Sequence, residues 1–138
     1  LDLSLECVIT CSLDRELKVW SLKGKFMKRY DLTSFTNETI ISIKITHHGL
    51  FLGSKDMNIY LVDIHKGKLC VVYEGHWSKV SLINQVPYKP ILITVSESNI
   101  KVWDLEKDEC VQNMNEHTSP IVYCQVSEVN PEKVISIS

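Results

Sequence analysis

The chain has 138 residues and a mass of 15.8 kDa, with 44% hydrophobic and 23% charged residues. This balance is typical of a soluble globular protein and excludes a disordered chain. The net charge of −2 and the isoelectric point near 6.2 argue against a dedicated nucleic-acid-binding domain. No apolar run approaches the ~18 residues of a membrane-spanning helix.

Short apolar runs recur along the chain with a constant spacing. The first covers residues 8–12, and similar runs follow at 50–54, 92–96 and 134–138, each 42 residues after the one before. A second series agrees, because Trp20, Val62 and Trp103 are 42 and 41 residues apart. His76 and His117 are also separated by 41 residues. Three landmarks with one period indicate a repeat architecture.

Each period has the composition of β-strands. Runs rich in Val, Ile, Thr and Tyr are bounded by turn residues such as His48-Gly49 and Asn130-Pro131. The pattern predicts four strands per period, which in the third period cover residues 79–86, 91–96, 99–105 and 109–113. No helical stripe is present in the sequence.

These residues resemble the WD-repeat β-propeller family, whose repeat of ~40–45 residues carries Gly-His and Trp-Asp signatures. The resemblance rests on Gly75-His76, Trp103-Asp104, Trp20, His117, and on Asp14 and Asp56 six positions before the Trp or its substitute. It implies an all-β fold of propeller blades with four antiparallel strands, expected to form part of a larger, seven-bladed propeller. A second copy closing the ring is the alternative.

The expected blades divide the chain at three points. The first blade covers residues 1–32 without its first strand, and the second covers 33–75. The third covers 76–116, and the fourth covers 117–138 with its first two strands only.

The resemblance also implies a buried hydrogen-bond network of His, Ser or Thr, Asp and Trp within each blade. In the third blade the matching residues are His76, Thr94, Glu97 and Trp103, where Glu97 replaces the family's Asp in a shorter turn that its longer side chain is expected to span. The other blades supply fewer members: Thr10, Asp14 and Trp20 in the first, Asp56 in the second, and His117 and Ser136 in the fourth.

The second blade departs most from the family pattern. Leu52 and Val62 occupy the hydroxyl and Trp positions, and Leu32 or Thr33 stands where the His is expected. Apolar packing is therefore expected to stabilise this blade.

The polar residues do not predict chemistry. A His, a Thr and a carboxylate resemble a catalytic triad, but the group recurs in each period and lacks an oxyanion donor. His47-His48 has no further ligand at metal-binding spacing and is interpreted as a turn. The Lys23, Lys25, Lys28 and Arg29 cluster is interpreted as a solvated hairpin edge. No catalytic, cofactor-binding or metal-binding residue is expected, and no cofactor.

The five cysteines, an odd number without a CxxC pair, argue against a disulfide framework. Cys70 and Cys110 have similar contexts 40 residues apart and are expected to be buried at equivalent positions. Unpaired cysteines indicate a reducing intracellular compartment, either cytoplasm or nucleus.

The resemblance implies a non-enzymatic scaffold or adaptor that binds protein or peptide partners and no membrane. The candidate partner-binding residues are Trp77, which follows His76 in the connection that leads to the first strand of the third blade, and Lys79, Lys55 and Arg15, expected at the same rim. Two alternatives stay open: a nucleic-acid-associated propeller, against which the charge balance argues, and a targeting or regulatory domain of a larger enzyme.

Overall fold

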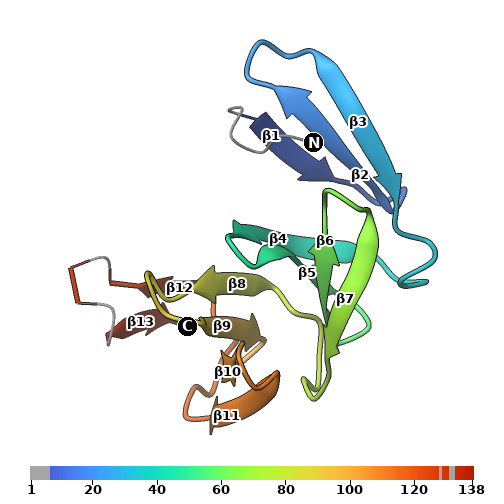
Figure 1. The fold of residues 1–138 in the computed structure, drawn as a ribbon. Helices are drawn as coiled ribbons and strands as arrows, with labels where there is room; N and C mark the ends of the chain where they lie inside the picture. The colour runs from blue at the N-terminus through green and yellow to red at the C-terminus, as the bar shows by residue number, and fades with distance from the viewer. Residues whose placement is uncertain (1–6, 128, 131–132) are drawn as a thin grey trace.

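The computed structural model describes residues 7–127, 129–130 and 133–138, and every regular element within them is a β-strand (Figure 1). The strands are β1 (Cys7–Cys11), β2 (Glu16–Ser21), β3 (Phe26–Asp31), β4 (Ile40–Thr46), β5 (Gly49–Ser54), β6 (Ile59–Asp63), β7 (Lys68–Tyr73), β8 (Leu82–Gln85), β9 (Ile91–Ser96), β10 (Asn99–Asp104), β11 (Glu109–Met114), β12 (Tyr123–Val126) and β13 (Val134–Ile137). These described segments include no helix long and apolar enough to cross a membrane.

The strands form four antiparallel sheets that follow one another in chain order. The orders are β1-β2-β3, β4-β5-β6-β7, β8-β9-β10-β11 and β12-β13. In Figure 1 the first sheet lies at the top, and the next two lie below it. The strands β4 and β8 contact each other, as do β8 and β12, so the sheets meet along their first strands. The predicted all-β architecture with four-stranded units is confirmed.

The repeat is visible in the strand register as well as in the sequence. In the first three sheets the pairing of the last two strands shifts, at Val19/Trp20, Leu61/Val62 and Val102/Trp103. A β-bulge adds one residue to one strand and re-aims the neighbouring side chain. The same irregularity therefore sits at each Trp position, including the second unit, where the Trp is replaced by Val62.

The predicted strands of the third unit match the structure closely, with one difference at the start. The first strand begins at Leu82 and not at residue 79. The preceding backbone is bonded to the neighbouring sheet, because the Val80 amide donates to the Ser54 carbonyl at 3.1 Å and Ser42 Oγ donates to the Val80 carbonyl at 2.7 Å. Sequence periodicity does not distinguish a residue paired within its sheet from one bonded to the next sheet.

The hydrophobic core lies between the sheets, in three separate clusters. Leu17 and Leu52 belong to the cluster between the first and second sheets, and Phe51 and Trp103 to the one between the second and third. Val95 and Val126 belong to the cluster between the third and fourth. Adjacent residues of β5 thus enter different clusters, because successive side chains of a strand point to opposite faces.

A backbone hydrogen bond joins successive sheets at nearly the same place in two units. The Val80 amide donates to the Ser54 carbonyl at 3.1 Å, and the Ile121 amide donates to the Glu97 carbonyl at 2.8 Å. In both cases the donor precedes the first strand of one sheet, and the acceptor lies at the end of the second strand of the sheet before it. We call this contact the inter-sheet joint.

The cysteines differ from expectation in their burial. All five are free, but Cys70 and Cys110 are exposed, and only Cys124 is buried. The two exposed cysteines are also not at equivalent positions, because Cys110 pairs with Trp103 on β10, whereas the residue that pairs with Val62 on β6 is Leu69. Both cysteines lie on the last strand of their sheet, which pairs with a neighbour on one edge only, so a similar sequence context does not guarantee burial.

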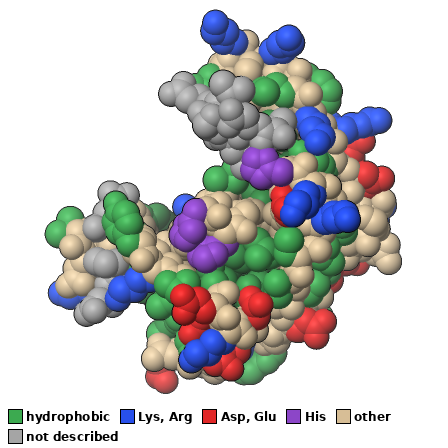
Figure 2. All heavy atoms as spheres, in the orientation of Figure 1, with side chains coloured by type: hydrophobic (Ala, Val, Ile, Leu, Met, Phe, Trp, Pro, Cys, Tyr) green, Lys and Arg blue, Asp and Glu red, His purple; other side chains and the backbone are tan. Residues whose placement is uncertain are grey.

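The basic cluster of the first sheet lies on the surface. Lys23, Lys25, Lys28 and Arg29 are exposed around the β2–β3 hairpin. Figure 2 shows Lys and Arg side chains projecting at the top of the view, where Figure 1 places this sheet. Arg29 pairs with Glu16 at 3.2 Å, and Lys28 lies 4.5 Å from the centre of the Tyr30 ring.

Candidate functional site

A buried chain of hydrogen bonds crosses the third sheet. Thr94 on β9 is 0% exposed, and its hydroxyl accepts from the Trp103 indole Nε1 at 2.8 Å. His76 Nε2 lies 2.6 Å from the same hydroxyl oxygen. Because the indole N–H can only donate, the Thr94 hydroxyl hydrogen is available for His76 Nε2, which leaves the ring proton on Nδ1. The strands β9 and β10 and the connection before β8 thus meet at one hydroxyl group.

The surroundings of His76 favour the neutral imidazole. The side chain is 5% exposed. Burial, and secondarily the charge of Lys101, lower the pKa of His76 to about 4, although the nearby Asn99 side chain acts in the opposite direction. A neutral, buried ring whose Nε2 is bonded to Thr94 is suited to a structural role in the sheet.

Glu97 does not join this network as expected. The turn between β9 and β10 has two residues, Glu97 and Ser98, whereas the corresponding turn between β5 and β6 has four. In the short turn Glu97 has a positive φ of 49°, and its carboxylate accepts from Ser78 Oγ at 2.9 Å. Shortening the turn directs the carboxylate to the surface and not to His76.

Asn99 occupies the place beside His76, and the sequence reasoning missed it. His76 Nδ1 and Asn99 Oδ1 are the buried side-chain atoms of the described residues that lack a hydrogen-bond partner. One is a donor in the tautomer set by Thr94, and the other is an acceptor. Asn99 is fixed by its amide, which donates to the side-chain oxygens of Asn113 and Asn115. The sequence feature that could have identified Asn99 is an Asn at the start of the third strand, directly after a turn of two residues.

The first sheet contains the Thr–Trp part of the same network. The Trp20 indole donates to Thr10 Oγ1 at 2.9 Å. Asp14 accepts from the Glu16 amide and from Lys18 Nζ, both at 3.0 Å. The turn amide, the Ser12 hydroxyl and Lys18 lower the pKa of Asp14 to about 2. Asp14 therefore stabilises its own turn.

The second sheet has a different polar group. Asp56 accepts from the Thr36 hydroxyl, from the Tyr60 hydroxyl at 2.7 Å and from the Asn58 amide at 3.1 Å. The expectation of purely apolar packing was therefore incomplete. Leu32, one of the two residues considered at the His position, is buried in the core, and Thr36 is the residue that reaches Asp56. Tyr60, two residues before Val62, supplies the donor from the third strand.

The fourth sheet contains the His–Ser pair. His117 Nε2 lies 2.8 Å from Ser136 Oγ. The His76–Thr94 contact of the third sheet is of the same kind. In both sheets a His before the first strand contacts a hydroxyl group on the second strand.

The four candidate partner-binding residues lie at one end of the sheets. This end, which we call the rim face, consists of the turns 12–15, 55–58 and 97–98 and the connection 74–81. Trp77 is 70% exposed, and Lys79 and Lys55 are exposed beside it, brought near each other by the bond between Val80 and Ser54. Arg15 differs, because its guanidinium donates to the Asn37 carbonyl at 3.2 Å and so bridges the first and second sheets.

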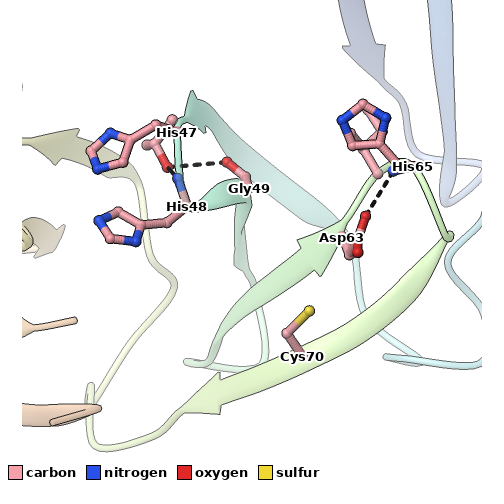
Figure 3. Close-up of a pocket in the computed structure, with 8 residues that line it drawn as sticks. His47, His48, Gly49, Asp63, His65 and Cys70 are labelled. Carbon is pink, nitrogen blue, oxygen red and sulfur yellow. Dashed lines mark hydrogen bonds between the residues drawn. The ribbon is translucent and has the colours of Figure 1, made fainter. Parts of the chain in front are cut away.

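A hollow lies at the opposite end of the second sheet (Figure 3). His47 and His48 lie on one side of it, and Asp63, His65 and Cys70 lie on the other. The His47 and His48 rings are 4.0 Å apart, while Asp63 accepts from the His65 backbone amide at 2.9 Å. Burial and the neighbouring His47 lower the pKa of His48. In the described part of the chain no three His, Cys, Asp or Glu residues are arranged to hold a metal ion.

Comparison with known proteins identifies the repeat. A family model, "WD domain, G-beta repeat", matches residues 67–104, which include β7, β8, β9 and β10. Two solved structures, "Crystal structure of RRP9 WD40 repeats" and "Structure of U3-55K", superimpose on 84% of this chain, each with a TM-score of 0.75. Their identities are 16% and 15%, and the chain covers 37% and 38% of their lengths. The fold is therefore that of WD-repeat propeller blades.

Two curated proteins are similar in sequence. A "Periodic tryptophan protein 2 homolog" from Dictyostelium discoideum is 28% identical over 86 residues, which is 61% of this chain and 9% of that protein. A "Kinesin-like protein KIF21B" from Mus musculus is 29% identical over 76 residues, which is 54% of this chain and 5% of that protein. The chain thus spans less than a tenth of the length of either relative.

Proposed function

Because the chain belongs to the WD-repeat β-propeller family, we propose that it is a non-enzymatic interaction module whose rim face binds a protein or peptide partner. The observation that carries this proposal is the 70% exposure of Trp77, a large apolar side chain in a connection between sheets. Exposed Trp residues are enriched among the side chains that dominate binding energy at protein interfaces.

The surroundings of Trp77 suit a protein surface. Lys79 and Lys55 lie on the same face, and the backbone bond between Val80 and Ser54 fixes their segments relative to each other. A rigid platform loses little conformational entropy on binding, which favours affinity. Arg15 is assigned a different role, because its guanidinium donates to the Asn37 carbonyl and so links the first two sheets.

The polar groups that could perform catalysis are already used within the sheets. His76 and Thr94 are buried and bonded to each other, and Thr94 also bonds to Trp103. Asp56 is bonded to Thr36 and Tyr60. These contacts support a structural role for the network and a function based on binding.

The same proposal includes the blade limits and the compartment. We assign blades to residues 1–32, 33–75, 76–116 and 117–138, where each of the four sheets lies within one range and residues 1–6 lie outside the described residues. Five free cysteines, two of them exposed, support an intracellular location.

The test is affinity capture from a cell lysate with the wild-type chain and a Trp77→Ala, Lys79→Glu double variant. A matched control changes an aromatic residue and a lysine at the opposite end of the same sheet, Tyr88→Asn with Lys107→Glu, where both residues are exposed. All three proteins must have the same thermal midpoint.

We expect a protein that the wild type and the control capture and the rim variant does not. Capture of the same proteins by all three would refute binding through Trp77 and Lys79. Recovery of nucleic acid that is lost steeply with added salt would instead support the alternative function, because phosphate contacts release counterions.

A further inference from the structure

Lys101 is a buried cation without an acidic partner. The residue, in the middle of β10, is 8% exposed. Its Nζ donates to Asn113 Oδ1 at 3.2 Å, and the ion pairs found in the described residues do not include it. Buried lysines are rare unless paired, because removing an ammonium group from water costs several kcal/mol.

The neighbours of Lys101 do not neutralise its charge. His76 is neutral above a pKa of about 4, and the Lys101 charge itself contributes to that low value. Asn113 provides a neutral amide oxygen, which also accepts from Asn99. An ammonium group has three donor hydrogens, and the described side chains account for one of them.

The Lys101 ammonium lies directly beneath the rim face. Its Nζ is 6.0 Å from the centre of the Trp77 ring, which is exposed, and Asn113, the acceptor of its hydrogen bond, is exposed as well. The side chains on which the buried cation rests, Trp77 and Asn113, are therefore both exposed, as a site for a ligand arriving from solvent requires. Because Asn113 Oδ1 is taken by Lys101 and Asn99, the Asn113 amide nitrogen is directed away from this network and is suited to donate outward.

We propose that Lys101, Asn113 and Trp77 form a binding site for the carboxylate of an Asp or Glu residue in an acidic segment of a protein partner. The carboxylate accepts from Lys101 Nζ and the Asn113 amide, and the aliphatic part of the same segment packs on the Trp77 ring. This inference rests on the proposed function and names the chemistry that the rim face recognises.

The charge of the site matches one carboxylate better than a phosphate group. The site has one buried cation and a neutral amide, whereas phosphate sites in proteins are typically built with arginines or several backbone amides. Glu97 also lies on the rim face, held by Ser78 at 2.9 Å. Its negative charge repels a phosphate group, which carries up to two negative charges, more strongly than a carboxylate, which carries one.

The experiment measures peptide binding to the full chain by NMR, observing the backbone amide signal of Asn113, which every variant retains. The probes are three acetylated tripeptide amides that differ in the central residue: Leu-Glu-Leu, Leu-Gln-Leu and Leu-phosphoserine-Leu. The variants are Lys101→Met, which removes the cation at similar size, and Trp77→Leu, which changes only an exposed ring. Lys107→Met, at an exposed lysine of the same sheet, is the control.

We expect saturable binding of the Glu peptide to the wild type and to Lys107→Met, at least fivefold weaker binding to Lys101→Met and Trp77→Leu, and no saturation with the Gln peptide. Lys101→Met is also expected to raise the thermal midpoint, because it removes an unpaired buried charge. Equal affinity for the Glu and Gln peptides, unchanged affinity in Lys101→Met, or tighter binding of the phosphoserine peptide would each overturn the proposal.

Failure of this site and failure of the proposed function give different results. A partner that Lys101→Met still captures and Trp77→Ala, Lys79→Glu does not would retain the interaction module and reject the carboxylate site. Discrimination between the Glu and Gln peptides without any captured partner would retain the site and reject the rim face as a protein-binding surface.

Discussion

Substitution of Thr94 by Val tests the buried network most directly. Valine has nearly the shape of threonine and removes only the hydroxyl group that contacts His76 at 2.6 Å and Trp103 at 2.8 Å. Thr94 is fully buried, so water cannot replace the lost partner. Each orphaned buried donor or acceptor costs about 1–3 kcal/mol, and two of them give an expected loss of about 2–6 kcal/mol in the free energy of unfolding.

The first sheet provides the matched control. The Trp20 indole donates to Thr10 Oγ1 at 2.9 Å, the same bond in the same place, but Thr10 is exposed. Water can satisfy the indole there, so Thr10→Val is expected to cost less than about 0.5 kcal/mol.

Urea unfolding followed by far-UV circular dichroism measures both variants. Thr94→Val should be the more costly substitution by at least about 1.5 kcal/mol. If Thr94→Val and Thr10→Val were equally mild, burial would not determine the strength of the network. A double variant, Thr94→Val with Trp103→Phe, should lose less than the sum of the single losses, because the two residues share one bond.

Three further predictions follow from other contacts. The pKa of His76 is about 4 in the folded chain and ~6.5 in the unfolded chain, so the unfolded state binds more protons between these pH values. The free energy of unfolding should therefore fall by about 3 kcal/mol as the pH drops from 7 to 4. Urea melts of the wild type and of His76→Asn across this range measure the change, and stability that rises on acidification would contradict the prediction. Gly53→Ala should destabilise by about 2 kcal/mol or more, because an added Cβ would lie 2.7 Å from the Val80 carbonyl oxygen; calorimetry measures this, and an unchanged midpoint would show that the sheets can separate. Tyr73→Phe should cost about 1 kcal/mol by removing the 2.6 Å bond to Asp108; urea melts measure it, and Asp108→Asn, which keeps an acceptor, should cost less.

The repeat and the strands could be predicted from the sequence because they depend on local patterning. Alternating apolar residues and turn residues at a constant period determine which segments pair. The contact between Thr94 and Trp103 follows from the same register, since both residues sit at fixed positions on neighbouring strands.

The parts that could not be predicted depend on small changes in turn length and on exposure. A turn shortened to two residues directs Glu97 outward and brings Asn99 beside His76, which a family pattern based on Asp does not contain. In the second sheet Thr36 reaches Asp56 from outside any strand, so periodicity gives no signal for it. Cys70 is exposed and not buried as expected, because burial depends on which neighbours cover a strand.

The inter-sheet joint has a consequence for how such repeats diversify. Its donor and acceptor are main-chain atoms, the Val80 amide with the Ser54 carbonyl and the Ile121 amide with the Glu97 carbonyl. Any residue except proline can supply the donor, so the geometry between neighbouring units is inherited without a conserved side chain. A unit without the signature residues, such as the second, which has Val62 at the Trp position, can therefore still dock in the same orientation. This independence explains how three-dimensional similarity can extend over 84% of the chain while the family model matches only residues 67–104.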